Sequence, residues 1–183
     1  ARACAAPGSA TIVVPVQTKP ARHGAHERRA AEAASLMPIA AAVFLDIDGV
    51  LNSTSWWARR TTMEFPFREF DPACLERLEV LLYEHDAALV ISSSWRSGRD
   101  TADLRNLFNE VGEFWGLGLG LPERIVGATE VLERERGEEV ASFCSEHEVR
   151  RYVILDDQTD FFETQPLVWI DPAYGLRDAD IDR

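Results

Sequence analysis

Apolar residues fall in short unbroken runs from residue 39 onward, separated by longer polar stretches. Residues 39–45 and 87–91 are apolar throughout, which is typical of parallel strands that are buried on both faces. Three shorter runs of the same kind follow later in the chain. The pattern predicts strands over residues 39–45, 87–91, 125–126, 152–155 and 167–170.

The stretches between these runs have the spacing of helices. Over residues 73–85 the leucines recur at intervals of three and four, which places them on one helical face. Asp71 and Pro72 come just before, in the order of an N-cap followed by proline at the first helical position. The spacing predicts helices over residues 73–85, 100–110 and 133–146, with a glycine-rich loop over 112–121.

Strands that alternate with helices indicate an α/β fold with a mostly parallel sheet of five strands. In such sheets, ligands bind beyond the carboxyl ends of the strands. We therefore expect the functional site at that edge. Polar residues follow four of the predicted strands there: Asp46 and Asp48, Ser92 and Ser93, Asp156 and Asp157, and Asp171.

The first 38 residues differ in composition from the rest. They are rich in alanine, proline and arginine without sustained periodicity, so we expect a flexible tail or linker over 1–38 and one folded unit over 39–183. The chain of 183 residues has a net charge of −12. Residues 1–38 hold five basic and two acidic residues, which leaves −15 on the remainder. Lys19 is the only lysine, so arginine must supply the cations of the folded unit.

Composition narrows the class of protein. Hydrophobic residues make up 46% of the chain and charged residues 27%, as in a soluble globular protein. No apolar run reaches the ~18 residues of a membrane-spanning helix, so we expect no membrane association. Three widely spaced cysteines fit neither a disulfide framework nor a zinc site, which favours reduced thiols and a cytoplasmic location. The acidic unit disfavours extended, nonspecific binding of nucleic acid.

The most informative local motif is the pair Asp46-x-Asp48 at the end of the first strand. Two carboxylates at this spacing can share one metal ion, and Mg²⁺ prefers oxygen ligands. One carboxylate can attack phosphorus and form an aspartyl phosphate. A second carboxylate can protonate the leaving oxygen and later activate water. Gly49 permits the sharp turn that keeps these groups near one point, and it is a candidate for substrate binding.

Several further motifs follow this pair in order. They are FLDIDGVLN (44–52), SSSWR (92–96), RGEEV (136–140), YVILDD (152–157) and Asp171 with Gly175-Leu176. Together they resemble the haloacid dehalogenase (HAD) superfamily of phosphohydrolases, and more narrowly a small-cap branch associated with RNA-repair multidomain proteins. The resemblance covers about residues 39–177. It implies a three-layer α/β/α, Rossmann-like fold with a minimal cap over residues 53–70.

The resemblance also implies the chemistry. It makes the chain an Mg²⁺-dependent phosphomonoester hydrolase, with Asp46 as the nucleophile and Asp48 as the general acid and base. The backbone carbonyl of Asp48 also reaches the metal. Asp157 first, and Asp156 second, complete the metal ligands together with Asp46.

The second motif of the superfamily is a serine or threonine that hydrogen-bonds the transferring phosphoryl group. Ser92 fits best because it directly follows the apolar run, and Ser93 is the next candidate. Ser94 is expected to be a helix N-cap or a turn residue. Arg96 either clamps a phosphate with two hydrogen bonds or pairs with acids at the surface.

The cation of the superfamily is normally a lysine, which the folded unit lacks. Arg136 opens the RGEEV motif twenty residues before Asp156, and we expect it to take this role because a dense anionic site needs a fixed cation. Arg134 is the alternative. Asp171 serves either the site or a turn before Pro172.

The predicted cap is too short for a domain of its own, so we expect an open site. It contains Trp56 and Trp57 close to several arginines. These rings either stack a base of the substrate or cover the end of the core. The expected partner is a phosphorylated small molecule, or the phosphate end of a nucleotide or oligonucleotide.

Three other functions are weighed against this one. A catalytically silent phosphate-binding or scaffold module of the same fold is disfavoured because Asp46 and Asp48 are both present. A phosphotransferase shares the covalent intermediate and differs only in the acceptor. A two-component receiver is disfavoured by the order of the acidic motifs and by the missing lysine.

Overall fold

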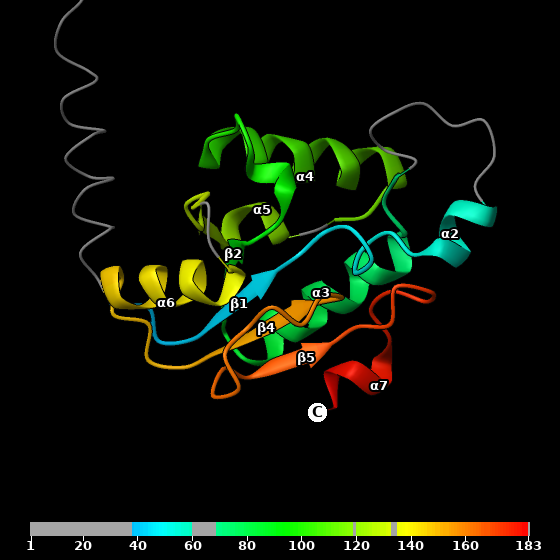
Figure 1. Ribbon diagram of the computed structural model, residues 1–183. Helices are drawn as coiled ribbons and strands as arrows, with labels where there is room; N and C mark the ends of the chain where they lie inside the picture. The colour runs from blue at the N-terminus through cyan, green and yellow to red at the C-terminus, as the bar shows by residue number, and fades with distance from the viewer. Residues whose placement is uncertain (1–37, 60–68, 119, 133–134, 183) are drawn as a thin grey trace, which may run out of the picture. The chain divides into compact units, whose positions relative to one another are not determined.

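A computed structural model of the chain describes residues 38–59, 69–118, 120–132 and 135–182 (Figure 1). The predicted tail up to residue 37, half of the predicted cap (residues 60–68), Cys4 and Arg134 therefore lie outside the described residues. Five strands form one sheet in which every neighbouring pair is parallel, which confirms the predicted α/β class. The order across the sheet is β3 (Ile125–Ala128), β2 (Ala88–Ile91), β1 (Ala42–Leu45), β4 (Tyr152–Asp156) and β5 (Leu167–Trp169).

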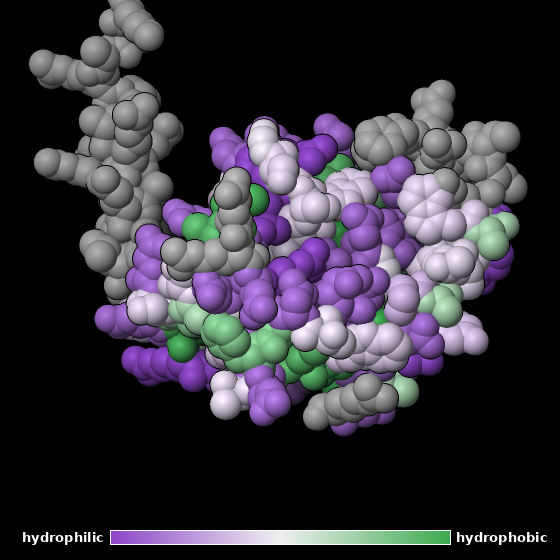
Figure 2. All heavy atoms as spheres, in the orientation of Figure 1, coloured by the Kyte–Doolittle hydropathy of each residue, from purple (hydrophilic) through white to green (hydrophobic). Residues whose placement is uncertain are grey.

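Helices cover both faces of the sheet, so the fold has three layers (Figure 1). On one face, α6 (Arg136–Glu146) packs through Val140 and Phe143 against Phe44 and Val90. The rings of Phe44 and Phe143 meet edge to face at 5.6 Å. Figure 2 shows hydrophilic residues over α6 on this side and a band of apolar residues below it. The other face carries α3 (Pro72–Glu84), α4 (Thr101–Trp115), α5 (Leu121–Arg124) and α7 (Asp178–Ile181).

The start of α3 is set by local sequence, as predicted. The Asp71 side chain accepts a hydrogen bond from the amide of Ala73 at 3.0 Å, and Pro72 occupies the first turn. Such a cap contributes about 1 kcal/mol to a helix. The apolar face of α3 is buried in the larger of the two core clusters.

The prediction was wrong about the end of α4. The helix was expected to stop at residue 110 before a loop, but it continues to Trp115. Val111 and Gly112 are buried, so the amphipathic face extends one turn further than the leucine spacing indicated. Gly116, with a φ of +67°, ends the helix in the left-handed conformation that glycine adopts readily.

Tertiary contacts also account for the other differences. The short helix α2 (Thr54–Arg59) was not predicted, and it docks on α4 through Trp56 and Trp115. Strand β1 begins at Ala42 rather than at residue 39. Ile39 instead exchanges backbone hydrogen bonds with His147 and Arg150, which follow α6. A helix as short as α2 leaves no periodic signal in the sequence, and neither do the backbone hydrogen bonds of Ile39.

The two cysteines in the described part of the chain, Cys74 and Cys144, are free. Burial raises the pKa of both thiols to about 11, so they are poor nucleophiles. None of the helices in that part is long and apolar enough to cross a bilayer.

Candidate active site

Polar side chains from three neighbouring strands lie in one row at the carboxyl edge of the sheet. Strand register aligns Leu45 with its neighbours in β2 and β4, so Asp46, Ser92 and Asp156 come next in the same row. The amide of Asp46 donates to the carbonyl of Leu155 at 2.9 Å, and the amide of Ser92 donates to that of Leu45 at 2.8 Å. Because side chains alternate along a strand, all three face the side of the sheet that α6 covers.

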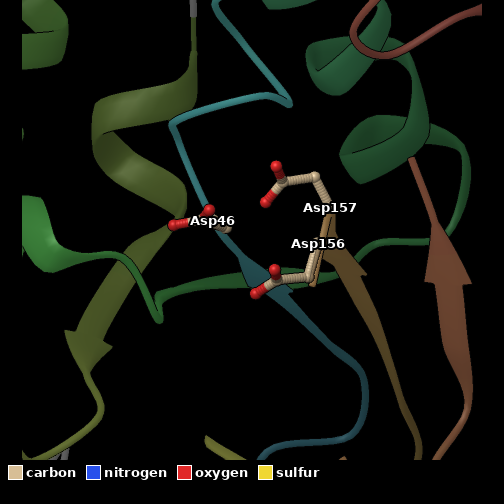
Figure 3. A group of neighbouring side chains, drawn as sticks. All are labelled: Asp46, Asp156 and Asp157. Carbon is tan, nitrogen blue, oxygen red and sulfur yellow. The ribbon is translucent and has the colours of Figure 1, made fainter. Parts of the chain in front are cut away.

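Three carboxylates gather at this edge, from the ends of β1 and β4 (Figure 3). Oxygens of Asp46, Asp156 and Asp157 all lie within 4.8 Å of one another. Asp46 and Asp156 are buried, whereas Asp157 is half-buried. Burial raises the pKa of Asp46, and burial together with repulsion from Asp46 raises the pKa of Asp156 to about 7. Carboxylates packed this closely need a positive charge to stay ionised together.

Arg136, the first residue of α6, supplies one such charge. Its Nη1 donates a hydrogen bond to Oδ2 of Asp156 and lies 3.5 Å from Oδ1 of Asp46. Burial alone would lower the pKa of Arg136, but the two carboxylates hold it above its ordinary value. The structure thus brings the expected replacement for lysine to the acidic group.

The donor set fits a divalent cation such as Mg²⁺. All three side chains offer carboxylate oxygens, the ligand type that Mg²⁺ prefers. Oδ1 of Asp46 is buried and accepts no hydrogen bond from any described residue. One arginine among three carboxylates leaves negative charge that a cation would neutralise.

The side chain of Asp48 faces different partners. It is exposed, and its carboxylate does not belong to the group of three. Oδ1 accepts a hydrogen bond from Nδ2 of Asn52 at 2.8 Å, and Oδ2 accepts one from Nε1 of Trp95 at 3.0 Å. The predicted part of Asp48 in metal binding therefore depends on its backbone carbonyl and stays a prediction.

The turn after Asp48 leaves no room for a side chain. Gly49 has a φ of +80°, and a Cβ there would lie 2.7 Å from Cγ of Asp157. The amide of Gly49 donates to Oδ1 of Asn52 at 2.8 Å, so it is already engaged in the turn. Asn52, which the sequence interpretation left without a role, therefore fixes both the turn and the carboxylate of Asp48. Its only signal was its place at the end of the first motif.

The segment 92–96, called the serine loop below, follows β2. The hydroxyl of Ser92 is buried and has no partner among the residues that the structure describes, so Ser92 keeps its place as the first candidate for binding phosphate. The hydroxyl of Ser93 accepts a hydrogen bond from the amide of Trp95 at 3.5 Å, and hydrogen bonding from Ser93 favours the ionised form of Asp46. Of the two expectations for Ser94, the N-cap is wrong, because Ser93 caps the short helix η2 (Ser94–Arg96), and Ser94 is instead the first residue of that single helical turn.

Arg96 does pair with an acid, but not at the surface as expected, and its contact with a phosphate stays a prediction. It is buried rather than at the surface, and its Nη2 lies 2.5 Å from a carboxylate oxygen of Glu139. Its Nη1 donates to the carbonyl of Ser93 at 2.7 Å. Arg96 is thus committed to an ion pair that ties the serine loop to α6, the helix that begins with Arg136. The sequence interpretation did not single out Glu139.

The aromatic candidates of the predicted cap pack against the domain. The rings of Trp56 and Trp115 meet at 5.8 Å, and the guanidinium of Arg59 lies 6.0 Å from the centre of the Trp56 ring. Trp57 is half-buried in the same helix. Contact of Trp56 and Trp57 with substrate stays a prediction.

A different tryptophan lies at the acidic group. Trp169 ends β5 in register with Asp156, and its indole N–H donates to the carbonyl of Asp157 at 2.8 Å. Its side chain is exposed, with 45% of its surface accessible. Asp171, two residues later, accepts the amide of Ala173 at 2.9 Å, as in a turn.

The model of one protein family matches most of the chain. The family is described as the HAD domain in Swiss Army Knife RNA repair proteins, and the match covers residues 42–181. The three carboxylates, Arg136 and the serine loop all lie within the match. A search of curated proteins found no match.

Proposed function

The chain belongs to the family of HAD domains in Swiss Army Knife RNA repair proteins, and on that basis we propose that it is an Mg²⁺-dependent phosphomonoester hydrolase. The observation that carries the proposal is the buried carboxylate of Asp46, whose Oδ1 lacks a hydrogen-bond partner among the described residues and faces Arg136 at 3.5 Å. Asp156 and Asp157 would hold the metal together with Asp46. When bound, Mg²⁺ would neutralise charge on the phosphate and orient it.

In the proposed reaction, the Asp46 carboxylate attacks phosphorus in line, and the bond from phosphorus to the leaving oxygen breaks. Arg136 offsets negative charge on the transferring group, and the hydroxyl of Ser92 donates to one of its oxygens. The carboxyl group of Asp48 gives its proton to the leaving oxygen. Asp48 then takes a proton from water, which attacks the aspartyl phosphate and releases inorganic phosphate and free Asp46.

The test of this function is a phosphatase assay on the metal-stripped full chain. We expect no turnover in excess chelator and full recovery when Mg²⁺ is restored. Ca²⁺ should substitute poorly because it is larger and takes more ligands in a looser geometry. The panel of esters includes nucleoside monophosphates, sugar phosphates and oligonucleotides with 3′- or 5′-phosphates. Hydrolysis that continues unchanged in chelator contradicts the metal-dependent mechanism.

We further propose that the substrate is the phosphate end of a nucleotide or polynucleotide. The family description places related domains in RNA repair proteins. The exposed ring of Trp169, anchored on the backbone of Asp157, supports the same substrate class. An aromatic face beside a phosphate site can stack a base whatever its sequence, which suits an enzyme that acts on ends.

Replacing Trp169 should separate substrates with a base from those without one. We expect Trp169→Ala to lower kcat/KM about tenfold for a nucleoside 5′-monophosphate, in line with the stacking of one base. Ribose 5-phosphate, which has no base, should change by less than about twofold, since it has no ring to stack. Steady-state kinetics on both esters measures the difference.

Trp169→Phe is the matched control. It keeps an aromatic face but removes the N–H that bonds the carbonyl of Asp157. It should retain most of the preference for the nucleotide if stacking is responsible. Equal losses on the two esters in Trp169→Ala contradict base recognition by this ring.

A further inference from the structure

The indole of Trp95 makes a contact that none of the roles above explains. Trp95 lies in the serine loop, 47 residues from Asp48 in sequence, and its Nε1 lies 3.0 Å from Oδ2 of that residue. Asn52 occupies the other carboxylate oxygen, Oδ1, at 2.8 Å. Each oxygen of Asp48 therefore has its own donor, which fixes the plane of the carboxylate.

The Trp95 ring is held independently of Asp48. It meets the ring of Phe70 edge to face at 5.2 Å, and Phe70 is fully buried against Phe108 at 5.8 Å. The guanidinium of Arg99 lies 5.9 Å from the ring centre, and its Nη1 donates to the carbonyl of Trp95 at 2.7 Å. The N–H thus projects from a ring that the core and the backbone already position.

An indole is well suited to orient an acid without competing with it. Its N–H only donates a hydrogen bond and does not titrate in the physiological range, so it neither accepts nor stores the proton that the carboxyl group transfers. Because Asp48 is otherwise exposed, its orientation depends on these two donors.

We propose that Trp95 is a positioning residue that aims the carboxyl group of Asp48 at the leaving oxygen. The inference rests on the proposed phosphatase function and adds a dependence on the leaving group. The alcohol of an alkyl phosphate ester needs that proton in order to leave, whereas a strongly acidic phenol leaves as its anion without it. Loss of the indole N–H should therefore slow the first kind of ester and spare the second.

The test compares β-glycerol phosphate with 2,4-dinitrophenyl phosphate in Trp95→Phe, which keeps a ring and removes the N–H. The measured quantity is kcat/KM, which reports formation of the aspartyl phosphate and not its hydrolysis. We expect a loss of about tenfold for the glycerol ester, as for a lost hydrogen bond to a charged group, and less than about twofold for the dinitrophenyl ester. In an Asp48→Asn background, Trp95→Phe should add no further loss.

Trp115→Phe is the matched control, because it makes the same change at an indole whose N–H has no hydrogen-bond partner among the described residues. It should leave both esters within about twofold, as expected where no hydrogen bond is lost. The indole N–H resonance in proton–nitrogen spectra gives a readout without turnover. The resonance lost in Trp95→Phe should shift in Asp48→Asn, while that of Trp115 stays in place.

The outcomes separate the two proposals. An unshifted Trp95 resonance, or equal losses on the two esters, overturns the positioning role and leaves the phosphatase intact. A parent protein without Mg²⁺-dependent turnover of any ester overturns the phosphatase and the positioning role with it.

Discussion

Asp46→Asn should abolish turnover, with a fall in kcat on the order of 10⁴-fold or more, because an amide cannot form the aspartyl phosphate. The variant should still fold. Burial and the neighbouring Asp156 both disfavour the negative charge on Asp46, and together they outweigh its attraction to Arg136 at 3.5 Å. Removing that charge should therefore not destabilise the fold. We expect the thermal midpoint of the metal-free variant to equal or exceed that of the parent. Steady-state assays and thermal unfolding measure the two effects.

The control is the same change at the end of another strand. Asp171→Asn alters a carboxylate that accepts the amide of Ala173 in a turn, and it should cost less than about threefold in kcat. Rapid acid quench with a radiolabelled ester should trap label on the parent and none on Asp46→Asn. Label that passes to an added alcohol instead of water identifies a phosphotransferase. Bound phosphate without any covalent label identifies a silent module, and an active Asp46→Asn contradicts the nucleophile assignment.

Arg136→Ala should lower kcat/KM by on the order of 10³-fold, because it removes the arginine that lies among the buried carboxylates. Arg136→Lys should lose about tenfold, since it keeps the charge but replaces a planar fork with a single ammonium. The comparison tests whether arginine fills the position that lysine usually takes. Arg134→Ala is the matched control and should stay close to the parent. A large loss in Arg134→Ala with little change in Arg136→Ala would reverse the assignment.

Arg136→Ala should also change how the affinity for Mg²⁺ depends on pH. The pKa of Asp156 is raised from 3.8 to about 7, so protons compete with the metal below about pH 7 and the affinity for Mg²⁺ rises as pH rises through that value. From about pH 4 to about pH 7 the metal-free protein loses stability as pH rises, because in this interval the unfolded chain has released the Asp156 proton that the folded protein still holds. Arg136 lowers this pKa, and its removal should move the binding midpoint to higher pH. Calorimetric titrations of parent and variant at several pH values measure the displacement.

The sequence predicted the strands well because their signal is local. Each apolar run that fills a strand of the buried sheet is visible by itself, and the polar residues that end it mark the carboxyl edge. The C-terminal end of α4 and the presence of α2 were missed for the opposite reason. Trp115 continues α4 and receives Trp56 of α2, a contact that no periodicity within either segment indicates.

The site divides in the same way. Asp46, Asp156 and Arg136 belong to motifs with fixed positions at strand or helix ends, so their meeting could be expected. The contacts of Trp95 with Asp48 and of Arg96 with Glu139 join residues more than forty positions apart. No local sequence pattern around one residue of such a pair predicts the other residue, and only the packed fold brings the two together.

The central place of β1 in the sheet has a consequence for synthesis of the protein. Asp46 is translated more than a hundred residues before Asp156 and Asp157, yet the three carboxylates form one group only when β4 pairs with β1. A nascent or truncated chain that lacks β4 therefore has the nucleophile without the proposed metal ligands. Mg²⁺ would then protect only the completed domain from unfolding and proteolysis, and turnover would begin only once α6 and the strand after it, β4, are in place.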